Sequence, residues 1–414
     1  MKAPLICSFI FVAIHACAQS GAPGSVTVPI TLDHNRALVE VALALPDGSK
    51  QRVRAWVDNG NPELTLSRHL ATLLALAVTC GENDCTAPPP HELEIGGMSV
   101  PLSPADVAHI PLRPVSSAAV MAPGMNAEIN IPSTVLRNYD VLFDFPGRHL
   151  TIGNPGTVKF NGVKSKVMVN AANGLIEVPG QIENKKYNLA LDLGSSISFL
   201  SPELFDKLAA AHPDWPQMTG AIGPANMWGL PDEPTNKLFL LDRLQYGPVY
   251  LTSIATVEFS KERFAFFEKR AGIATAGLLG QEALMNYRVG LDYAHSAAYF
   301  EIGRTFKFPD FDLVGLILRA EDDGRFTLLA VANYDDKASV ADAQAGDQLV
   351  AVDGIPVLGS TLGQVLLMLG GEPGKERRLT LARNGKQFEV VAEVHHFLAE
   401  ADAADKGAAR QKRK

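Results

Sequence analysis

Residues 55–74 read AWVDNGNPELTLSRHLATLL, and residues 190–209 read ALDLGSSISFLSPELFDKLA. Each stretch starts as an apolar strand, continues through Asp-x-Gly into an alternating segment that ends in Leu-Ser, and finishes with a helical pattern. The serine follows the aspartate by nine residues in both copies, counted from Asp58 in the first and from Asp192 in the second. Because order and spacing match together, we interpret the two stretches as copies of one strand–turn–helix unit.

A second pair of similar stretches closes each copy. TVLRNYDVLFDFPGRHLTIG in the first half parallels EALMNYRVGLDYAHSAAYFEIG in the second. Tyr139 and Tyr287 are 148 residues apart, and the next aspartate that both stretches share has the same spacing. The chain is therefore predicted to contain two homologous lobes, at residues 30–155 and 165–305.

Short strand patterns separated by glycine and proline fill the rest of each lobe. HELEIGGMSVPLS contains a turn at Gly96-Gly97, and LFLLDRLQYGPVYLTS contains a Gly-Pro turn. Ser67 and Ser201 precede the two helical patterns and are expected to cap them, because a serine side chain accepts a hydrogen bond from a free N–H group of the first turn. Each lobe is predicted to be mainly antiparallel β with one or two helices.

The pattern changes after a linker near residues 306–311. Four segments follow: GLILRAEDDGRFTLLAVA, KASVADAQAGDQLVAVDGIPVLG, LGQVLLMLGG and RRLTLARNGKQFEVVAEV. Most of them alternate as strands do, and residues 362–369 have the apolar pattern of a helix. We predict a small α+β domain at residues 306–400, so that a mainly β chain contains three domains.

Residues 1–18 have the composition of a secretory signal peptide. A lysine and a short apolar stretch are followed by Ala-Cys-Ala, the small-x-small pattern of a cleavage site. We expect cleavage after Ala18 and export to the periplasm or the exterior; the alternative is attachment of a lipid at Cys17. The apolar stretch is too short to span a membrane, and no later one is long enough. Residues 401–414 are expected to be a disordered basic tail.

Composition limits the classes of partner and cofactor. The chain has 47% hydrophobic and 20% charged residues, which is typical of a folded globular protein. Its net charge of −8 argues against nucleic acid as a partner, because phosphate binding requires a basic face. Beyond residues 1–18 the only cysteines are Cys80 and Cys85, and an even count in an exported chain predicts a disulfide. The sequence contains no metal-binding or phosphate-binding motif, so we expect neither a metal nor a cofactor.

The two lobes resemble the halves of retropepsin-like and pepsin-like aspartic proteases. Each half in that family has an apolar strand that ends in Asp-Thr/Ser-Gly, and Asp58 in VDNGN and Asp192 in LDLGSS stand at those positions. Leu278-Leu279-Gly280 matches the family's two apolar residues and glycine before a helix. The resemblance implies that the aspartates meet, share one proton and activate a water molecule for attack on a peptide bond. It also implies a polypeptide substrate, no cofactor and a monomer, because both lobes are in one chain.

Several positions depart from the pattern of this family. Its hydroxyl residue after each aspartate is replaced by Asn59 and by Leu193. The amide of Asn59 can take over a hydrogen bond, whereas the side chain of Leu193 cannot form one. The active-site turns are completed by Gly60, Gly194 and Ser195.

The first lobe departs from the family in two further places. Asn130-Ile131-Pro132 stands where the two apolar residues and the glycine are expected. The Gly96-Gly97 hairpin is the expected flap over the cleft, but it lacks the tyrosine that pepsin-like enzymes have there.

The C-terminal region resembles a PDZ domain, chiefly through AGDQLVAVDG at residues 345–354. In that family the backbone N–H groups of one loop bind the C-terminus of a peptide, which adds to the sheet as an edge strand. The resemblance assigns this role to Gly315, Leu316, Ile317 and Leu318. The alternative is a packing module without a ligand.

These observations lead us to expect an exported aspartic endopeptidase with a PDZ-like domain for polypeptide recognition. Asp58 and Asp192 are the expected catalytic residues. Two alternatives remain: a catalytically silent protein that binds peptides, and a structural interaction protein of the cell envelope.

Overall fold

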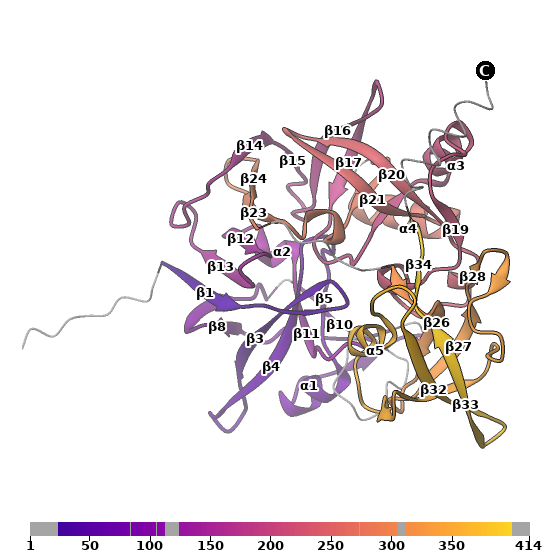
Figure 1. Cartoon of the computed structure of the whole chain (residues 1–414). Helices are drawn as coiled ribbons and strands as arrows, with labels where there is room; N and C mark the ends of the chain where they lie inside the picture. Colours follow the sequence, from indigo (N-terminus) through magenta and orange to yellow (C-terminus); the bar gives the residue numbers. More distant parts are fainter. Residues whose placement is uncertain are drawn as a thin grey trace, which may run out of the picture.

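The computed structural model describes residues 24–82, 84–104, 106–111, 124–272, 274–304 and 311–399. Strands form most of the regular structure in these residues, so the chain is mainly β, as the sequence predicts (Figure 1). The expected signal peptide at residues 1–18 and the expected tail at residues 401–414 lie outside the described residues. Within the described ranges, no helix has both the length and the apolar character needed to cross a membrane.

The first repeat is built around β4 (Lys50–Asp58), which ends at the first of the two aspartates. This strand lies between β3 (Arg36–Ala44), to which it is antiparallel, and β11 (Ile129–Pro132), to which it is parallel. The other elements of this repeat are β1 (Ser25–Pro29), β2 (Thr31–Asp33), β5 (Leu64–Thr65), α1 (Arg68–Leu73), β6 (Thr79–Cys80), β7 (Asp84–Ala87), β8 (Glu92–Ile95), β9 (Met98–Pro101), β10 (Ala108–Pro111), α2 (Ser133–Leu136), β12 (Asp140–Asp144) and β13 (His149–Gly153).

The second repeat has the same arrangement around β17 (Lys185–Leu191), which ends one residue before the second aspartate. β16 (Ile176–Ile182) is antiparallel to β17, and β22 (Gly277–Leu279) is parallel to it. The other elements are β14 (Val163–Lys166), β15 (Met168–Val169), β18 (Ser198–Leu200), α3 (Pro202–Ala211), β19 (Gln217–Thr219), η1 (Gly223–Ala225), η2 (Glu233–Thr235), β20 (Lys237–Tyr246), β21 (Val249–Glu258), α4 (Lys261–Ala271), η3 (Glu282–Leu284), β23 (Tyr287–Asp292) and β24 (Ala297–Ile302).

The helix that follows each aspartate turn begins at a serine. Ser67 Oγ accepts a hydrogen bond from Leu70 N at 2.9 Å, and Ser201 Oγ accepts one from Leu204 N at 3.3 Å. Pro202 occupies the first helical position of α3, where its missing N–H group costs nothing. Both predicted N-caps are confirmed.

One six-stranded sheet joins the two repeats, with the order β1-β13-β12-β23-β24-β14. At its centre β12 is antiparallel to β23, and Asp140 lies opposite Asp292. With the repeat spacing of 148 residues, the counterpart of Asp140 in the second repeat is Arg288, and the counterpart of Asp292 in the first repeat is Asp144. These two counterparts also lie opposite each other. The register is therefore symmetric about a pseudo-twofold axis between the lobes.

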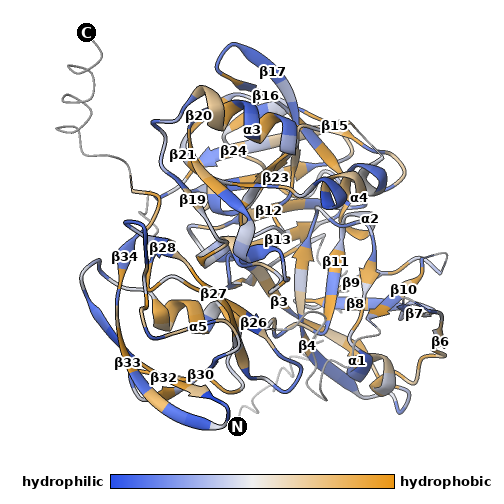
Figure 2. Ribbon diagram, turned by 90° about the vertical axis from the view of Figure 1, so that its right-hand side faces the viewer, coloured by the Kyte–Doolittle hydropathy of each residue, from blue (hydrophilic) through white to orange (hydrophobic). Residues whose placement is uncertain are grey.

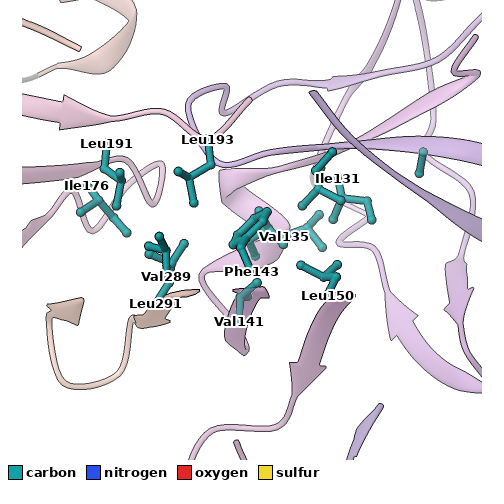
Figure 3. Close-up of a cluster of buried hydrophobic side chains, with 14 of the residues drawn as sticks. Ile131, Val135, Val141, Phe143, Leu150, Ile176, Leu191, Leu193, Val289 and Leu291 are labelled. Carbon is teal, nitrogen blue, oxygen red and sulfur yellow. The ribbon is translucent and has the colours of Figure 1, made fainter. Parts of the chain in front are cut away.

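A single hydrophobic core continues from the first repeat into the second. Figure 3 shows its centre, where the side chain of Leu193 lies among apolar side chains of both repeats, near Val289 and Leu291 of β23. Leu193 is fully buried. Burial of a leucine side chain stabilises a fold by about 1.5–3 kcal/mol, so the side chain of Leu193 contributes to the stability of the core.

Residues 311–399 form another sheet, with the strand order β26-β27-β30-β32-β33. Its own core includes the buried residues of α5. Figure 2 colours most of this helix as hydrophobic. A separate cluster, with Phe311, Ile317 and Phe397, packs this sheet against the second repeat. The elements are β25 (Asp312–Leu313), β26 (Leu316–Ala320), β27 (Phe326–Val331), β28 (Asn333–Tyr334), β29 (Lys337–Ala338), β30 (Gln348–Val352), β31 (Ile355–Pro356), α5 (Leu362–Leu369), β32 (Glu376–Arg383), β33 (Lys386–Glu393) and β34 (His395–His396).

Candidate active site

The two Asp-x-Gly turns meet between the lobes. A methyl group at Gly60 would lie 2.0 Å from Cγ of Asp192, and one at Gly194 would lie 2.2 Å from Oδ1 of Asp58. Each carboxyl group thus lies against the glycine of the opposite turn, in space that no side chain could share. The fold therefore brings together two aspartates that are far apart in the sequence.

Backbone N–H groups fix the orientation of both carboxyl groups. Gly60 N donates to Asp58 Oδ1 at 3.1 Å. Asp192 Oδ1 accepts from Gly194 N at 3.0 Å and from Ser195 N at 2.9 Å. Asp58 is buried and Asp192 is half-buried. Because hydrogen bonds to carboxylates are strong and directional, each turn holds its own aspartate in place.

Asn59 connects the two turns through its amide. Its Nδ2 donates to Leu191 O, and its Oδ1 accepts from Leu193 N, both at 2.7 Å. The side chain is fully buried. One amide thus satisfies a donor and an acceptor of the opposite turn, where the resemblance implied one hydroxyl from each lobe. The side chain of Leu193 then takes no part in the network and packs in the core.

Asn130 braces the first turn from the neighbouring strand. Its Oδ1 accepts from Thr65 N at 2.7 Å, and its Nδ2 donates to Glu63 O at 2.8 Å. Asn130 is fully buried on β11, the strand parallel to β4. The sequence marked this position only as a departure from the family pattern. The structure shows that the amide holds the chain that leaves the turn of Asp58.

A cleft of about 420 Å³ opens above the two aspartates. This volume lies within the range of ordinary ligand sites. Ser195, Met227 and Leu278 also contribute to the lining. The aromatic part of the wall is formed by Trp56, Phe199, Trp228, Phe259, Phe266 and Phe267, and polar groups are added to it by Asn61, Glu63, Thr65 and Arg263. The cleft can therefore contact both apolar and polar groups of a ligand.

The hairpin at Gly96-Gly97 does not lie over this cleft. A methyl group at Gly96 would lie 2.7 Å from Cγ1 of Val28, so the turn packs against β1. The turn at Gly247 packs against Ser165 of β14 in the equivalent way. No residue of the β8–β9 hairpin lines the cleft. The prediction of a flap at Gly96-Gly97 is therefore wrong, because edge strands of the central sheet hold both turns.

A buried arginine lies behind one wall of the cleft. The guanidinium carbon of Arg36 is 4.6 Å from the ring centre of Trp228 and 5.5 Å from that of Trp56. Its Nη2 donates to Met227 O at 2.9 Å. Arg36 is only 3% exposed. It therefore supports two aromatic side chains of the cleft from the protein interior.

The charge of Arg36 acts on the candidate site. Burial lowers its pKa to about 10, against the opposing effect of four carboxyl groups that include those of Asp58 and Asp192. The other two are Asp33 and Glu233, and burial raises the pKa of each. Arg36 thus remains a cation and favours the ionised forms of the aspartate pair. Sequence reasoning missed this residue, whose signal is an arginine at the start of the apolar strand RALVEVALA.

The loop expected to bind peptide C-termini lies at an edge that the chain itself covers. Leu316, Ile317 and Leu318 are buried on β26, the end strand of its sheet. Asn226 Oδ1 accepts from Leu318 N at 2.8 Å, and Asn226 Nδ2 donates to Leu318 O at 2.9 Å. Asn226 therefore occupies the backbone groups of Leu318 that an added strand would use. Gly315 precedes this strand with a φ of 80°.

Cys80 and Cys85 are joined by a disulfide. They face each other across the antiparallel pair β6 and β7. The predicted disulfide is confirmed. Among the residues that the structure describes, no group of three or more His, Cys, Asp or Glu side chains is placed to hold a metal ion.

No protein-family model matches the chain, and no curated protein matches its sequence. Among solved structures, an aspartic proteinase from Irpex lacteus is similar over 67% of this chain and 97% of its own length. The two share 11% sequence identity, with a TM-score of 0.40.

Proposed function

We propose that this protein is an exported aspartic endopeptidase that acts through Asp58 and Asp192. The observation that carries the proposal is the reciprocal contact in which each carboxyl group lies against the glycine of the opposite turn. The bridging amide of Asn59 and the cleft above the pair support it. The disulfide between Cys80 and Cys85 is compatible with an exported protein.

In the proposed mechanism the two carboxyl groups share one proton, because two adjacent carboxylates cannot both ionise at low cost. The ionised group removes a proton from a water molecule, and the water oxygen attacks the carbonyl carbon of a peptide bond. The protonated group donates to the carbonyl oxygen as the tetrahedral intermediate forms. The carboxyl group that now carries the proton donates it to the amide nitrogen, while the other accepts a proton from a hydroxyl group of the intermediate. The C–N bond breaks, an amine and a carboxylic acid leave, and the pair again holds one proton.

We propose that residues 306–400 form a PDZ-like domain for polypeptide recognition, which packs against the lobes. Binding of a peptide at residues 315–318 would require the displacement of Asn226. Support comes from the position of β26 at the edge of its sheet. Leu362 N, at the start of α5, also donates to Gly124 O of the first repeat at 2.8 Å. The region is thus held to both repeats by hydrogen bonds of the backbone of Leu318 and Leu362.

The charge of Arg36 favours a second candidate function, the binding of peptides without cleavage at neutral pH. A buried cation stabilises the state in which both aspartates are ionised, and that state has no proton to donate to the carbonyl oxygen. Cleavage should therefore be restricted to acid pH. At neutral pH the cleft would bind a peptide without cutting it.

Cleavage of an unfolded polypeptide between about pH 3 and 7 tests the proposal. Asp58→Asn and Asp192→Asn should each lower the rate by a factor on the order of 10²–10⁴, and the double variant should be no slower than either. Asp144→Asn is the matched control, since Asp144 is equally part of the repeat but bonds Gly147 N at a turn outside the site. Cleavage that survives in both single variants would exclude the proposed pair. Peptide binding without cleavage at any pH would favour the silent protein.

A further inference from the structure

A second cavity, of about 540 Å³, lies where the three parts of the chain meet. It is formed by β2 and the turn after it, by Pro224 of the second repeat and by the outer side of α5. None of its lining residues also lines the cleft above the aspartates. Junctions between structural units are common positions for small-molecule sites.

Three arginines from separate elements line this cavity: Arg54 of β4, Arg148 of the turn between β12 and β13, and Arg377 of β32. Arg377 already binds Asp353 through Nη1, at 3.0 Å. Among the residues that the structure describes, neither Arg54 nor Arg148 has a carboxylate within ion-pair distance, although the charge of Arg54 acts on the carboxyl group of Asp33. Both arginine side chains are exposed, and partial burial lowers the pKa of Arg148.

The acidic side chains of the cavity already have partners. Asp33 Oδ1 accepts from Thr361 Oγ1 at 2.8 Å, and burial raises the pKa of Asp33. Asp312 pairs with His396. The wall also contains His34, whose Nε2 bonds Gly223 O, and burial lowers its pKa to about 3, so the ring is neutral. The cavity is therefore a cationic site in a chain whose net charge is −8.

Most of the remaining lining is apolar. The helix α5 is apolar along its length, yet Leu367 is 80% exposed. Most of the apolar surface of this side chain is therefore in contact with solvent. The other apolar side chains of the cavity are those of Leu32, Pro224, Met285, Leu313 and Leu366. The uncharged polar side chains of the lining are those of Thr31, Asn35, Thr361 and Gln364, and the last two already bond each other's backbone N–H groups at the start of α5.

We propose that this cavity binds an aliphatic carboxylate, with its head group on Arg54 and Arg148 and its hydrocarbon chain along α5. A guanidinium group matches a carboxylate with two parallel hydrogen bonds. The hydrocarbon chain would cover Leu366 and Leu367 and needs no hydrogen-bond partners. Charge and apolar lining together favour a fatty acid over a peptide, and the inference is independent of the proposed peptidase activity.

Calorimetric titration of the full chain with dodecanoate tests the assignment. Arg54→Gln and Arg148→Gln should each weaken binding on the order of tenfold or more, because each removes a charge-assisted contact. Arg52→Gln is the matched control: Arg52 is on the same strand but pairs with Glu40 on the surface, so binding should not change. Dodecylamine, with the same chain and the opposite charge, should not bind.

Leu367→Ser should weaken binding of dodecanoate, because it removes apolar surface from the cavity wall. The melting temperature of each variant, measured without ligand, shows that the fold is intact. The assignment would be overturned if dodecanoate did not bind, or if binding were the same in Arg54→Gln, Arg148→Gln and the unmodified chain. Tighter binding of a leucine-terminated peptide than of dodecanoate would also overturn it.

Discussion

At the scale of single residues, Asn59 has the largest share in the geometry of the candidate site. Its amide carries both hydrogen bonds between the turns, so Leu193 is free to serve the core. The sequence suggested that Asn59 could replace a hydroxyl group. It did not reveal that one amide would bond both a donor and an acceptor, since that depends on how closely two distant turns approach.

Asn59→Leu should destabilise the fold by about 2–5 kcal/mol, because it leaves Leu191 O and Leu193 N buried without partners. Denaturant unfolding measures this change. Asn59→Asp keeps the acceptor for Leu193 N and loses only the donor, so its effect should be smaller if the bridge acts as described. Equal stability of Asn59→Leu and the unmodified chain would exclude a structural role for the bridge.

No sequence pattern pointed to Arg36, because its contacts with the candidate site are made with residues of other elements. Arg36→Met removes a buried positive charge, so the pKa of the nearby aspartates should rise. The pH profile of cleavage should then move to higher pH by roughly one unit or more. Arg36→Lys retains the charge and should keep the profile near that of the unmodified chain. An unshifted profile in a folded Arg36→Met variant would show that the charge does not reach the pair.

At the scale of elements, the segment with η1 and η2 connects the edge of β26 to the cleft. Asn226 bonds Leu318, and the next two residues, Met227 and Trp228, line the cleft. Glu233 fixes the segment by accepting from Trp228 N at 2.8 Å and Gly229 N at 3.1 Å. Strand and helix patterns could not predict this contact, because it is made by an irregular segment between elements.

Asn226→Ala should expose the backbone of Leu318 and allow a peptide to add to β26. The variant should bind peptides that have a free C-terminal carboxylate better than their amidated forms, whereas the unmodified chain should bind both weakly. Fluorescence anisotropy of labelled peptides gives the affinities. If Asn226→Ala shows no preference for the carboxylate, residues 315–318 do not form a terminus-binding loop, and the C-terminal region acts as a packing module.

At the scale of the whole molecule, the duplication seen in the sequence accounts for most of the fold. The spacing of 148 residues reappears as the register of the central sheet. Yet β1, at Ser25–Pro29, lies before the expected start of the first lobe, because its alternating SVTVP pattern is short and falls outside the repeated stretches. The meeting of Asp58 with Gly194 likewise depends on the packing of two lobes, which local patterns do not determine.

Because β12 and β23 pair about a pseudo-twofold axis, each position of β12 has its counterpart in β23. Leu142 faces Gly290 at that axis, and position 290 is the counterpart of position 142. Two copies of the first repeat in the same register would place Asp140 opposite Asp144, and like charges that face each other across a sheet are destabilising. In the chain itself Arg288 lies opposite Asp144 and pairs with it, so the first repeat is complementary to the second repeat and not to a copy of itself.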